Sequence, residues 1–322
     1  MLVHERGTMK KILIFGCMGF VGKYLSEEFL KHGYQVYGSD LSTNVVLNEA
    51  VKVQEADLLD AQRIEEVIRQ CLPDYIVNLA AISSVALSWK IPRDTLNINV
   101  NGTLNILEAV RRNDIKCKIL LIGSSEEYKK SNYPLSESCL LAPSNPYGVS
   151  KVMQEELARL YKTCYRLDIV CTRTFNHTGV GQPDRFVIPS FVKQIADIRK
   201  SKDTKKCIYV GNTEVIRAWG DVRDMARAYR MILESDSKVD VFNVGCDVNI
   251  KLSKVLEYII SLSNEEIEVV KDPLRLRPID NTIVGCDNTL LRTVTGWKPR
   301  FTIFETLNEM YNWYLENNVG EG

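Results

Sequence analysis

Three glycines at a spacing of three residues follow an apolar run near the start of this chain. The run is Lys11-Ile-Leu-Ile-Phe15, the glycines are Gly16, Gly19 and Gly22, and a helical pattern covers 20–31. In such a turn the first glycine permits a sharp bend, the second lets a pyrophosphate approach the backbone, and the third allows helix and strand to pack closely. The helix N-terminus then offers amides and a positive dipole to phosphates. The spacing therefore predicts a strand–turn–helix unit that binds a nucleotide.

Strand and helix patterns alternate through the first half of the chain. Strands are expected over 35–39, 51–54, 73–78, 118–122 and 167–173, and helices over 61–71, 94–112 and 146–165. Alternation of this kind predicts an α/β fold, a Rossmann-type doubly wound parallel sheet. After about residue 176 the alternation loosens, which indicates a smaller C-terminal lobe. We expect a flexible extension over 1–9, a nucleotide-binding domain over 10–176 to which some later segments return, and a lobe made mainly of 177–322.

The composition excludes several classes of protein. Lys and Arg number 41 and Asp and Glu also 41, so the basic surplus of a dedicated nucleic-acid binder is missing. No apolar run approaches the roughly 18 residues of a membrane span, and the mixed, polar start is unlike a signal peptide. The nine cysteines are scattered without a Cys-x-x-Cys pair, which favours reduced thiols, a cytoplasmic setting and no metal site.

Asp40 closes the second expected strand. A carboxylate at this place can accept hydrogen bonds from both ribose hydroxyls of NAD and would repel a 2′-phosphate. No arginine follows it in Leu41-Ser-Thr-Asn44. We therefore expect the cofactor to be NAD, with NADH preferred over NADPH.

Tyr147 and Lys151 open the long helical stretch at 146–165, four residues apart and so on one helix face. A free tyrosine titrates near ~10, too high for proton exchange at neutral pH, and a fixed positive charge beside it favours the phenolate. The strand at 118–122 delivers Ser124 to the carboxyl edge of the sheet, where open α/β folds bind ligands. This serine could hydrogen-bond a substrate oxygen beside the tyrosine.

Together these motifs resemble the extended short-chain dehydrogenase/reductases that act on nucleotide sugars, and the likeness runs from about Lys10 to the end. Asn99-Val-Asn-Gly-Thr103 and Thr295-Gly-Trp-Lys-Pro299 match segments typical of that family. The resemblance implies that Ser124, Tyr147 and Lys151 form the catalytic triad. It makes 10–176 the NAD-binding domain and 177–322 mainly the nucleotide-sugar-binding lobe. The cofactor-binding residues would be Gly16, Gly19, Phe20, Val21, Gly22, Asp40, Asp57, Leu58, Leu79, Ala80, Ala81, Asn99, Tyr147 and Lys151.

Within the family, several segments are most similar to members that reduce the C4 ketone of a GDP-linked 4-keto-6-deoxy sugar. They are 122–128, 173–179, 217–224 and 276–278. A diphosphate between base and sugar needs cations, and arginine supplies bidentate contacts. The resemblance assigns substrate contacts to Ser83, Ser125, Asn176, Phe186, Val187, Lys193, Arg217, Arg277 and Asp280.

The triad by itself leaves the reaction open. Reduction of the C4 ketone, with Tyr147 as proton donor, is the favoured reaction. A GDP-mannose-type 4,6-dehydratase, in which Glu126 removes the C5 proton, is the alternative, together with a C4 epimerase or dehydrogenase that retains NAD. A non-enzymatic NAD-binding regulator is the option from another class. By analogy with the family, the helices at 94–112 and 146–165 would lie on one side of the sheet and pair with a second subunit into a homodimer.

Overall fold

The computed structural model describes residues 9–42, 47–201, 206–275 and 282–317. The substrate residues expected at Arg277 and Asp280 therefore lie outside the described residues. The chain forms two compact units, described separately below. The first comprises Met1–Glu127, Asn145–Arg173 and Tyr229–Val241, and the second comprises Tyr128–Ser144, Thr174–Ala228 and Phe242–Gly322.

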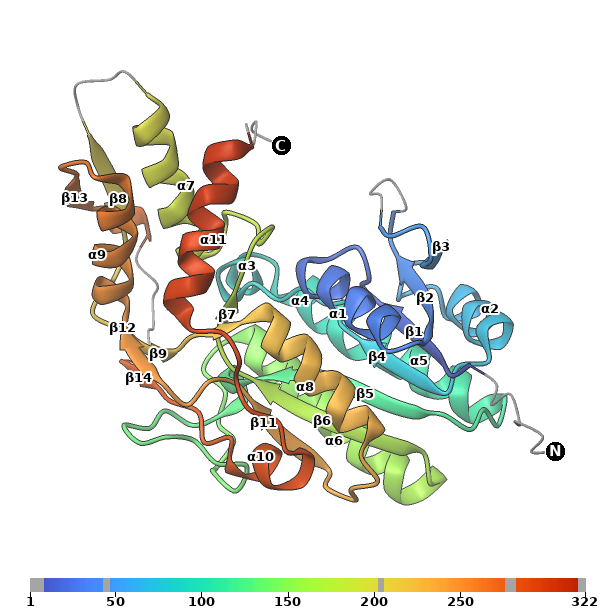
Figure 1. The fold of residues 1–322 in the computed structure, drawn as a ribbon. Helices are drawn as coiled ribbons and strands as arrows, with labels where there is room; N and C mark the ends of the chain where they lie inside the picture. The colour runs from blue at the N-terminus through green and yellow to red at the C-terminus, as the bar shows by residue number, and fades with distance from the viewer. Residues whose placement is uncertain (1–8, 43–46, 202–205, 276–281, 318–322) are drawn as a thin grey trace. The chain divides into compact units, whose positions relative to one another are not determined.

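A seven-stranded sheet has the order β11-β6-β5-β4-β1-β2-β3, and its strands β1 to β5 lie wholly in the first unit (Figure 1). The pairings from β3 through β2, β1 and β4 to β5 are all parallel. This confirms the expected Rossmann-type α/β fold. The strands are β1 (Lys11–Phe15), β2 (Gln35–Asp40), β3 (Lys52–Glu55), β4 (Tyr75–Asn78), β5 (Lys118–Ser124), β6 (Asp168–Thr174) and β11 (Val241–Val244).

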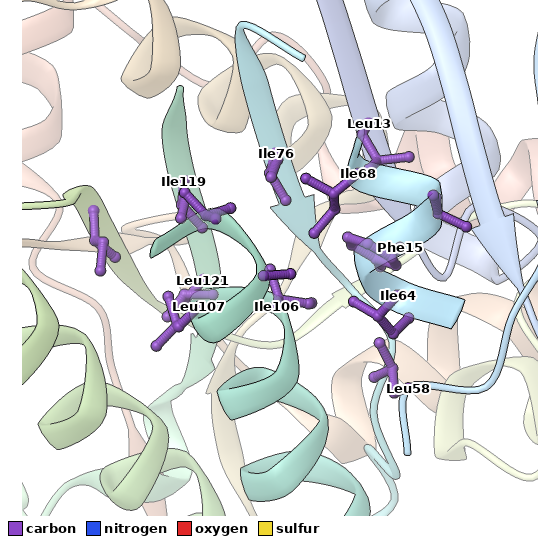
Figure 2. Close-up of a cluster of buried hydrophobic side chains, with 14 of the residues drawn as sticks. Leu13, Phe15, Leu58, Ile64, Ile68, Ile76, Ile106, Leu107, Ile119 and Leu121 are labelled. Carbon is purple, nitrogen blue, oxygen red and sulfur yellow. The ribbon is translucent and has the colours of Figure 1, made fainter. Parts of the chain in front are cut away.

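One face of this sheet is covered by three helices, α2 (Ala61–Cys71), α5 (Gly102–Arg112) and α6 (Pro146–Tyr165). In α2 the apolar residues recur at helical spacing, so that Ile64, Val67, Ile68 and Cys71 all point inward. They meet alternate residues of the strands, including Leu13 and Phe15 of β1, in one buried cluster (Figure 2). Ile106 and Leu107 of α5, with Ala158 and Tyr161 of α6, belong to the same cluster. The two helices therefore lie on the same side of the sheet.

Helix α1 (Phe20–Lys31) contacts β1 and β2, and the last turns of α8 (Val222–Glu234) lie beside it. Arg230 of α8 donates to the Glu28 carboxylate at 2.8 Å, and the Tyr34 hydroxyl after α1 donates to Glu234 at the same distance. The C-terminal half of α8 thus returns to the first unit.

The helix expected over 94–112 is interrupted. It consists of α4 (Pro92–Leu96), a π-helical segment over Asn97–Asn101 and α5, and α3 (Val85–Lys90) precedes it. The π-helical segment widens one turn of the helix, a local departure often found at functional sites. Asn99 is the one buried residue of this segment.

The second unit is built around a core of helices α7 (Val187–Lys200), α9 (Leu252–Ser263) and α11 (Ile303–Glu316). Trp219 and the apolar faces of these helices pack in that core. Short strands pair as β10-β7, β12-β9-β14 and β13-β8. They are β7 (His177–Thr178), β8 (Cys207–Val210), β9 (Ile216–Ala218), β10 (Gly220–Asp221), β12 (Asn249–Lys251), β13 (Glu268–Lys271) and β14 (Ile283–Val284), with helix α10 (Thr289–Thr295) nearby in sequence. Among the described helices of both units, none has the length and apolarity needed to cross a bilayer.

Candidate active site

The glycine turn has the shape that a dinucleotide requires. Gly16 has φ +81°, a left-handed value, and a Cβ there would lie 2.7 Å from the backbone nitrogen of Ala80. A Cβ on Gly22 would lie 2.3 Å from the Gly16 carbonyl oxygen. Gly19 is the N-cap of α1 and supplies no side-chain cap to the first helical amides. The turn thus fits a bound pyrophosphate, for which those amides are the natural donors.

Asp40 lies at the end of β2 beside this turn. Its carboxylate accepts hydrogen bonds from the backbone N–H of Met18 at 2.9 Å and of Leu41 at 2.8 Å. The structure therefore brings together the glycine turn, the Leu79–Ala80 segment after β4 and the acid after β2, as the sequence argument expected.

Two of the other expected cofactor residues have structural roles of their own. The Leu58 side chain is buried in the core, where it packs against Gly102. Asp57 is exposed, and its carboxylate accepts from the backbone N–H of Leu59 at 2.9 Å. Contact of these two with a cofactor stays a prediction.

Ser124, Tyr147 and Lys151 come together inside the first unit. Ser124 ends β5, and the other two lie on the buried face of α6. The Lys151 ammonium donates to the carbonyl oxygen of Ile122 at 2.6 Å and lies 5.9 Å from the centroid of the Tyr147 ring. All three side chains are less than a tenth exposed. The arrangement places a hydroxyl, a phenol and an ammonium at the carboxyl end of β5.

Burial dominates the electrostatics of this trio. It raises the pKa of the Tyr147 phenol, which a hydrogen bond with Ser124 lowers and the carboxylates of Glu127 and Glu126 raise. Burial lowers the pKa of Lys151 to about 8, against an upward pull from Glu127. Lys151 was expected to lower the pKa of Tyr147, whereas in the structure the group that lowers this pKa is the Ser124 hydroxyl.

Asn99 holds the site together from the π-helical segment. Its side-chain oxygen accepts from the backbone N–H of Ile82 at 2.8 Å, and its nitrogen donates to the Ser150 hydroxyl at 2.8 Å. Ser150 in turn donates to the Tyr147 carbonyl at 2.7 Å. Asn99 thus ties the loop after β4 to the turn of α6 that carries the tyrosine.

Glu126 and Asn145 form a second polar pair next to Ser124. The Asn145 amide donates to the Glu126 carboxylate at 2.7 Å, while its oxygen caps α6 by accepting from the Gly148 N–H at 2.8 Å. The Glu126 N–H donates to the Ser124 hydroxyl at 3.2 Å. Sequence reasoning missed Asn145, although an asparagine followed by proline at a helix start is a strong N-cap signal.

Glu127 was also missed, because adjacent carboxylates in Ser-Ser-Glu-Glu give no indication of which one turns inward. Its side chain is fully buried and accepts from the Ser124 N–H at 2.6 Å. Arg173 lies 4.0 Å away but makes its close contact, at 2.6 Å, with Glu155. Burial and the neighbouring Glu155 raise the pKa of Glu127 far above its usual range.

Candidate substrate residues in the second unit occupy three places. Arg217 is buried on β9 and donates to the Ile216 carbonyl at 2.9 Å. The Asn176 carbonyl accepts from the Gly220 N–H at 2.9 Å. Phe186 is the N-cap of α7, and Val187 begins that helix.

Lys193 on α7 lines a cavity of about 370 Å³, and Arg275 is the second cation among the described residues that line it. The cavity is also lined by Ser190, Gln194 and two carboxylates, Asp184 and Asp197. Lys193 contacts Asp184 at 2.7 Å, and Arg275 donates to the Ser190 hydroxyl at 3.4 Å. Sequence reasoning selected Arg277 from the run at 274–277 and missed Arg275, for which the run alone gives no distinguishing signal.

Of the remaining expected contacts, Ser83 is exposed after β4 and Ser125 is buried beside Ser124. Phe20 stacks edge-on with Tyr24 at the start of α1, and Val21 is half-buried.

Comparisons with known proteins agree with this geometry. The chain is 31% identical over 301 residues to a GDP-6-deoxy-D-mannose reductase from Pseudomonas aeruginosa, covering 92% of this chain and 95% of that protein. It is 29% identical to a GDP-mannose 4,6-dehydratase from Yersinia enterocolitica, covering 94% and 93%. The solved structure of RMD from Pseudomonas aeruginosa complexed with NADPH superposes with a TM-score of 0.83 at 29% identity, covering 96% and 99%. The family model described as GDP-mannose 4,6 dehydratase matches residues 13–310, so the chain belongs to this family of nucleotide-sugar enzymes.

Proposed function

We propose that the protein reduces the C4 ketone of a GDP-linked 4-keto-6-deoxy sugar, with NADH as the reductant. The observation that carries the proposal is the burial of the Ser124 hydroxyl at the end of β5 together with Tyr147 and Lys151, which lie on the buried face of α6. These are the groups that an oxygen needs when it changes between carbonyl and hydroxyl.

The role of each side chain follows from its chemistry. The nicotinamide cofactor, when bound, supplies the hydride. The phenolic O–H of Tyr147 donates the proton to the C4 oxygen, and the Ser124 hydroxyl hydrogen-bonds the same oxygen and polarises the carbonyl. The ammonium of Lys151 holds the nicotinamide ribose and favours the phenolate that remains. The glycine turn and Asp40 hold the rest of the dinucleotide.

The cavity beside α7 is our candidate for the nucleotide end of the substrate. Lys193 and Arg275 supply positive charge for a diphosphate. The edge of guanine carries N–H donors, and the carboxylates of Asp184 and Asp197 offer acceptors for them. A uracil ring presents fewer donors, which favours GDP over UDP. Competition by GDP, UDP and dTDP in one binding assay tests this choice.

A 4,6-dehydratase is the second candidate, and the observation that favours it is the Glu126–Asn145 pair. The amide holds the Glu126 carboxylate next to Ser124, where a base for the C5 proton would be needed. The chain is also similar to both reductases and dehydratases. A C4 epimerase or dehydrogenase would use the same triad.

A substrate panel separates these reactions. GDP-mannose, its 4-keto-6-deoxy product, and UDP- and dTDP-sugars are each incubated with NADH and with NADPH. A reductase consumes one NADH per product, whereas a dehydratase or an epimerase shows no net cofactor turnover. Conversion of GDP-mannose with catalytic NAD and no added NADH would overturn the reductase assignment.

We also infer a homodimer and a cytoplasmic setting. All nine cysteines are free thiols, which suits a reducing compartment. On α6, Val149, Met153 and Leu160 are 38%, 43% and 48% exposed and lie on one helix face. An exposed apolar stripe of this kind is typical of a helix that packs against a second subunit.

A further inference from the structure

The ammonium of Lys151 is held by a buried side chain that the catalytic trio does not include. Gln154 lies one turn further along α6 and is 2% exposed. Its side-chain oxygen accepts a hydrogen bond from the Lys151 ammonium at 3.1 Å. Its amide nitrogen donates to the Ile122 carbonyl at 3.1 Å, the same carbonyl that Lys151 contacts at 2.6 Å.

The orientation of this amide is determined by its partners. An ammonium only donates and a carbonyl only accepts, so the oxygen of Gln154 must face Lys151 and its nitrogen must face Ile122. The Thr103 hydroxyl also lies 3.3 Å from the Gln154 oxygen, but it donates its single proton to the Asn99 carbonyl at 2.8 Å. The acceptor capacity of Gln154 is therefore directed at the lysine.

A count of hydrogens shows what this arrangement achieves. An ammonium has three N–H donors, and the Ile122 carbonyl and the Gln154 oxygen take two of them. The third remains for the side of the site where Tyr147 lies. A lysine that had lost one of its two acceptors could rotate its ammonium and move along its flexible stem.

We propose that Gln154 is a positioning residue that fixes the Lys151 ammonium and keeps it protonated, so that one N–H stays directed at the cofactor ribose. This inference rests on the proposed role of Lys151. Burial lowers the pKa of Lys151 to about 8, and an acceptor beside the ammonium opposes that effect. Removing the acceptor should make the lysine lose its proton at a lower pH.

Other titratable groups also face Lys151 and must be separated from Gln154. They are Glu127 from the turn after β5, Cys171 from β6 and Tyr147 from α6 itself, with Arg173 and Glu155 paired behind Glu127. Burial raises the pKa of the Cys171 thiol well above its usual range, so the thiol carries no charge near neutral pH. Glu127 is the group whose titration could be confused with that of the lysine.

The test compares two substitutions with opposite expected effects. Gln154→Leu removes the acceptor at nearly the same size. Gln154→Glu keeps an acceptor for Lys151 and adds a negative charge, although it loses the donor to the Ile122 carbonyl. The dissociation constant of NADH, or of NADPH if it binds more tightly, is measured by fluorescence titration from pH 6 to pH 10, and kcat is measured alongside it. An exposed glutamine near the end of α2 provides the matched control, Gln70→Leu.

We expect Gln154→Leu to weaken dinucleotide binding about tenfold and to move the alkaline loss of binding about one pH unit lower. Gln154→Glu should move the alkaline loss of binding upward, because the added negative charge favours the ammonium. Both shifts should persist in a Glu127→Gln background. Gln70→Leu should change neither quantity. Thermal unfolding of each variant shows that the fold is intact, and a merely structural role would not shift the two variants in opposite directions.

Lys151→Met separates this inference from the function on which it rests. If Lys151→Met weakens dinucleotide binding while both Gln154 variants match the wild type, the role of Gln154 is wrong and the site assignment stands. Shifts in the same direction, or shifts that vanish in the Glu127→Gln background, also overturn it. If Lys151→Met itself leaves binding and turnover unchanged, the proposed site and the inference both fail.

Discussion

The carboxylate of Glu127 accepts a 2.6 Å hydrogen bond from the backbone N–H of Ser124 and is completely buried behind it. The second oxygen of Glu127 has no hydrogen-bond partner among the described residues. The nearest cation, Arg173, is already paired with Glu155. An ionised Glu127 would therefore be buried, close to the negative charge of Glu155, with little positive charge to compensate it. Burial and the nearby Glu155 together explain why the pKa of Glu127 is raised.

Glu127→Gln should consequently stabilise the protein without loss of turnover. The unfolded carboxyl ionises near its ordinary pKa of 4.5, whereas the folded one holds its proton to a higher pH. The folded state thus binds more protons above pH 4.5, and wild-type stability falls as the pH rises through that range. The advantage of the Gln variant should be near zero at pH 4 and grow toward neutral pH.

Chemical denaturation at pH 4 and pH 7 measures this effect, and the control is Glu49→Gln, at an exposed glutamate.

Glu127→Leu removes the acceptor of the Ser124 N–H and should lower kcat on the order of a hundredfold, because a small displacement of a reacting group has that cost. Equal kcat values for the Leu and Gln variants would contradict a role in holding Ser124.

Lys151→Met should abolish turnover and yet raise stability at neutral pH. Burial lowers the pKa of the folded lysine to about 8, below its ordinary 10.5, so the unfolded state binds the proton more tightly. The folded state carries the full cost of the ammonium below pH 8, and this cost disappears as the pH rises from 8 to 10.5. Methionine lacks that cost, which amounts to about 3 kcal/mol at most, less the two lost hydrogen bonds.

Urea unfolding at pH 7 and at pH 10 tests the sign of the change in unfolding free energy. The control is Lys129→Met, at an exposed lysine. A Met variant that is less stable than the wild type at pH 7 would show that the two hydrogen bonds outweigh the burial of the charge.

The features that could be predicted from the sequence are those marked by residues close together along the chain. Strand β1, helix α2 and helix α6 were predicted to the residue, because apolar residues at a regular spacing mark their extent. Ser124, Tyr147 and Lys151 were assigned to one site from the family resemblance. The start of α6 was placed correctly, whereas the strand expected over 118–122 runs two residues further, to Ser124. Three features could not be predicted: the burial of Glu127, the hydrogen bond between Gln154 and Lys151, and the cavity lined by Arg275. They depend on tertiary packing, which produces no regular pattern in the sequence.

Asp40 should make the protein prefer NADH. Its carboxylate lies beside the glycine turn and would repel a 2′-phosphate. The solved structure of the relative from Pseudomonas aeruginosa holds NADPH, so the preference is open to a direct test. Wild type should bind NADH at least about tenfold more tightly than NADPH, a difference of about 1.4 kcal/mol. Asp40→Ser should narrow or reverse that ratio, and a wild-type preference for NADPH would contradict the prediction.

The apolar stripe of α6 should hold two subunits together. Met153→Asp places a charge in the middle of the stripe and should convert a dimer into a monomer, because an unpaired charge is costly in an apolar interface. Light scattering after size exclusion gives the mass of each variant. Val248→Asp, at a residue that is 55% exposed in the second unit, is the control. A wild type that is monomeric at micromolar concentration would contradict the proposal.

Glu126 provides the sharpest test between the two candidate reactions. If the protein is a reductase, Glu126→Gln should keep reduction of the 4-keto-6-deoxy sugar within about threefold, because Tyr147 supplies the proton. If it is a dehydratase, the same change should lower turnover of GDP-mannose by about a thousandfold, because an amide cannot remove the C5 proton. The Asn145 amide can still meet the oxygen of a glutamine at 126, so the variant removes the base with little change to the surrounding contacts.

Deuterium incorporation at C5 of the sugar distinguishes the reductase from the dehydratase without any comparison of rates. In D₂O a dehydratase exchanges protons with its base and returns solvent deuterium to C5 of the sugar. Reduction at C4 by NADH touches only C4 and its oxygen, so the isolated product carries no C–D bond at C5. We expect the wild-type product to be free of C5 deuterium by NMR, since the hydroxyl of Ser124 and the phenol of Tyr147 both address the oxygen of C4. Deuterium at C5 that is lost in Glu126→Gln would instead assign Glu126 as the base and make the protein a dehydratase.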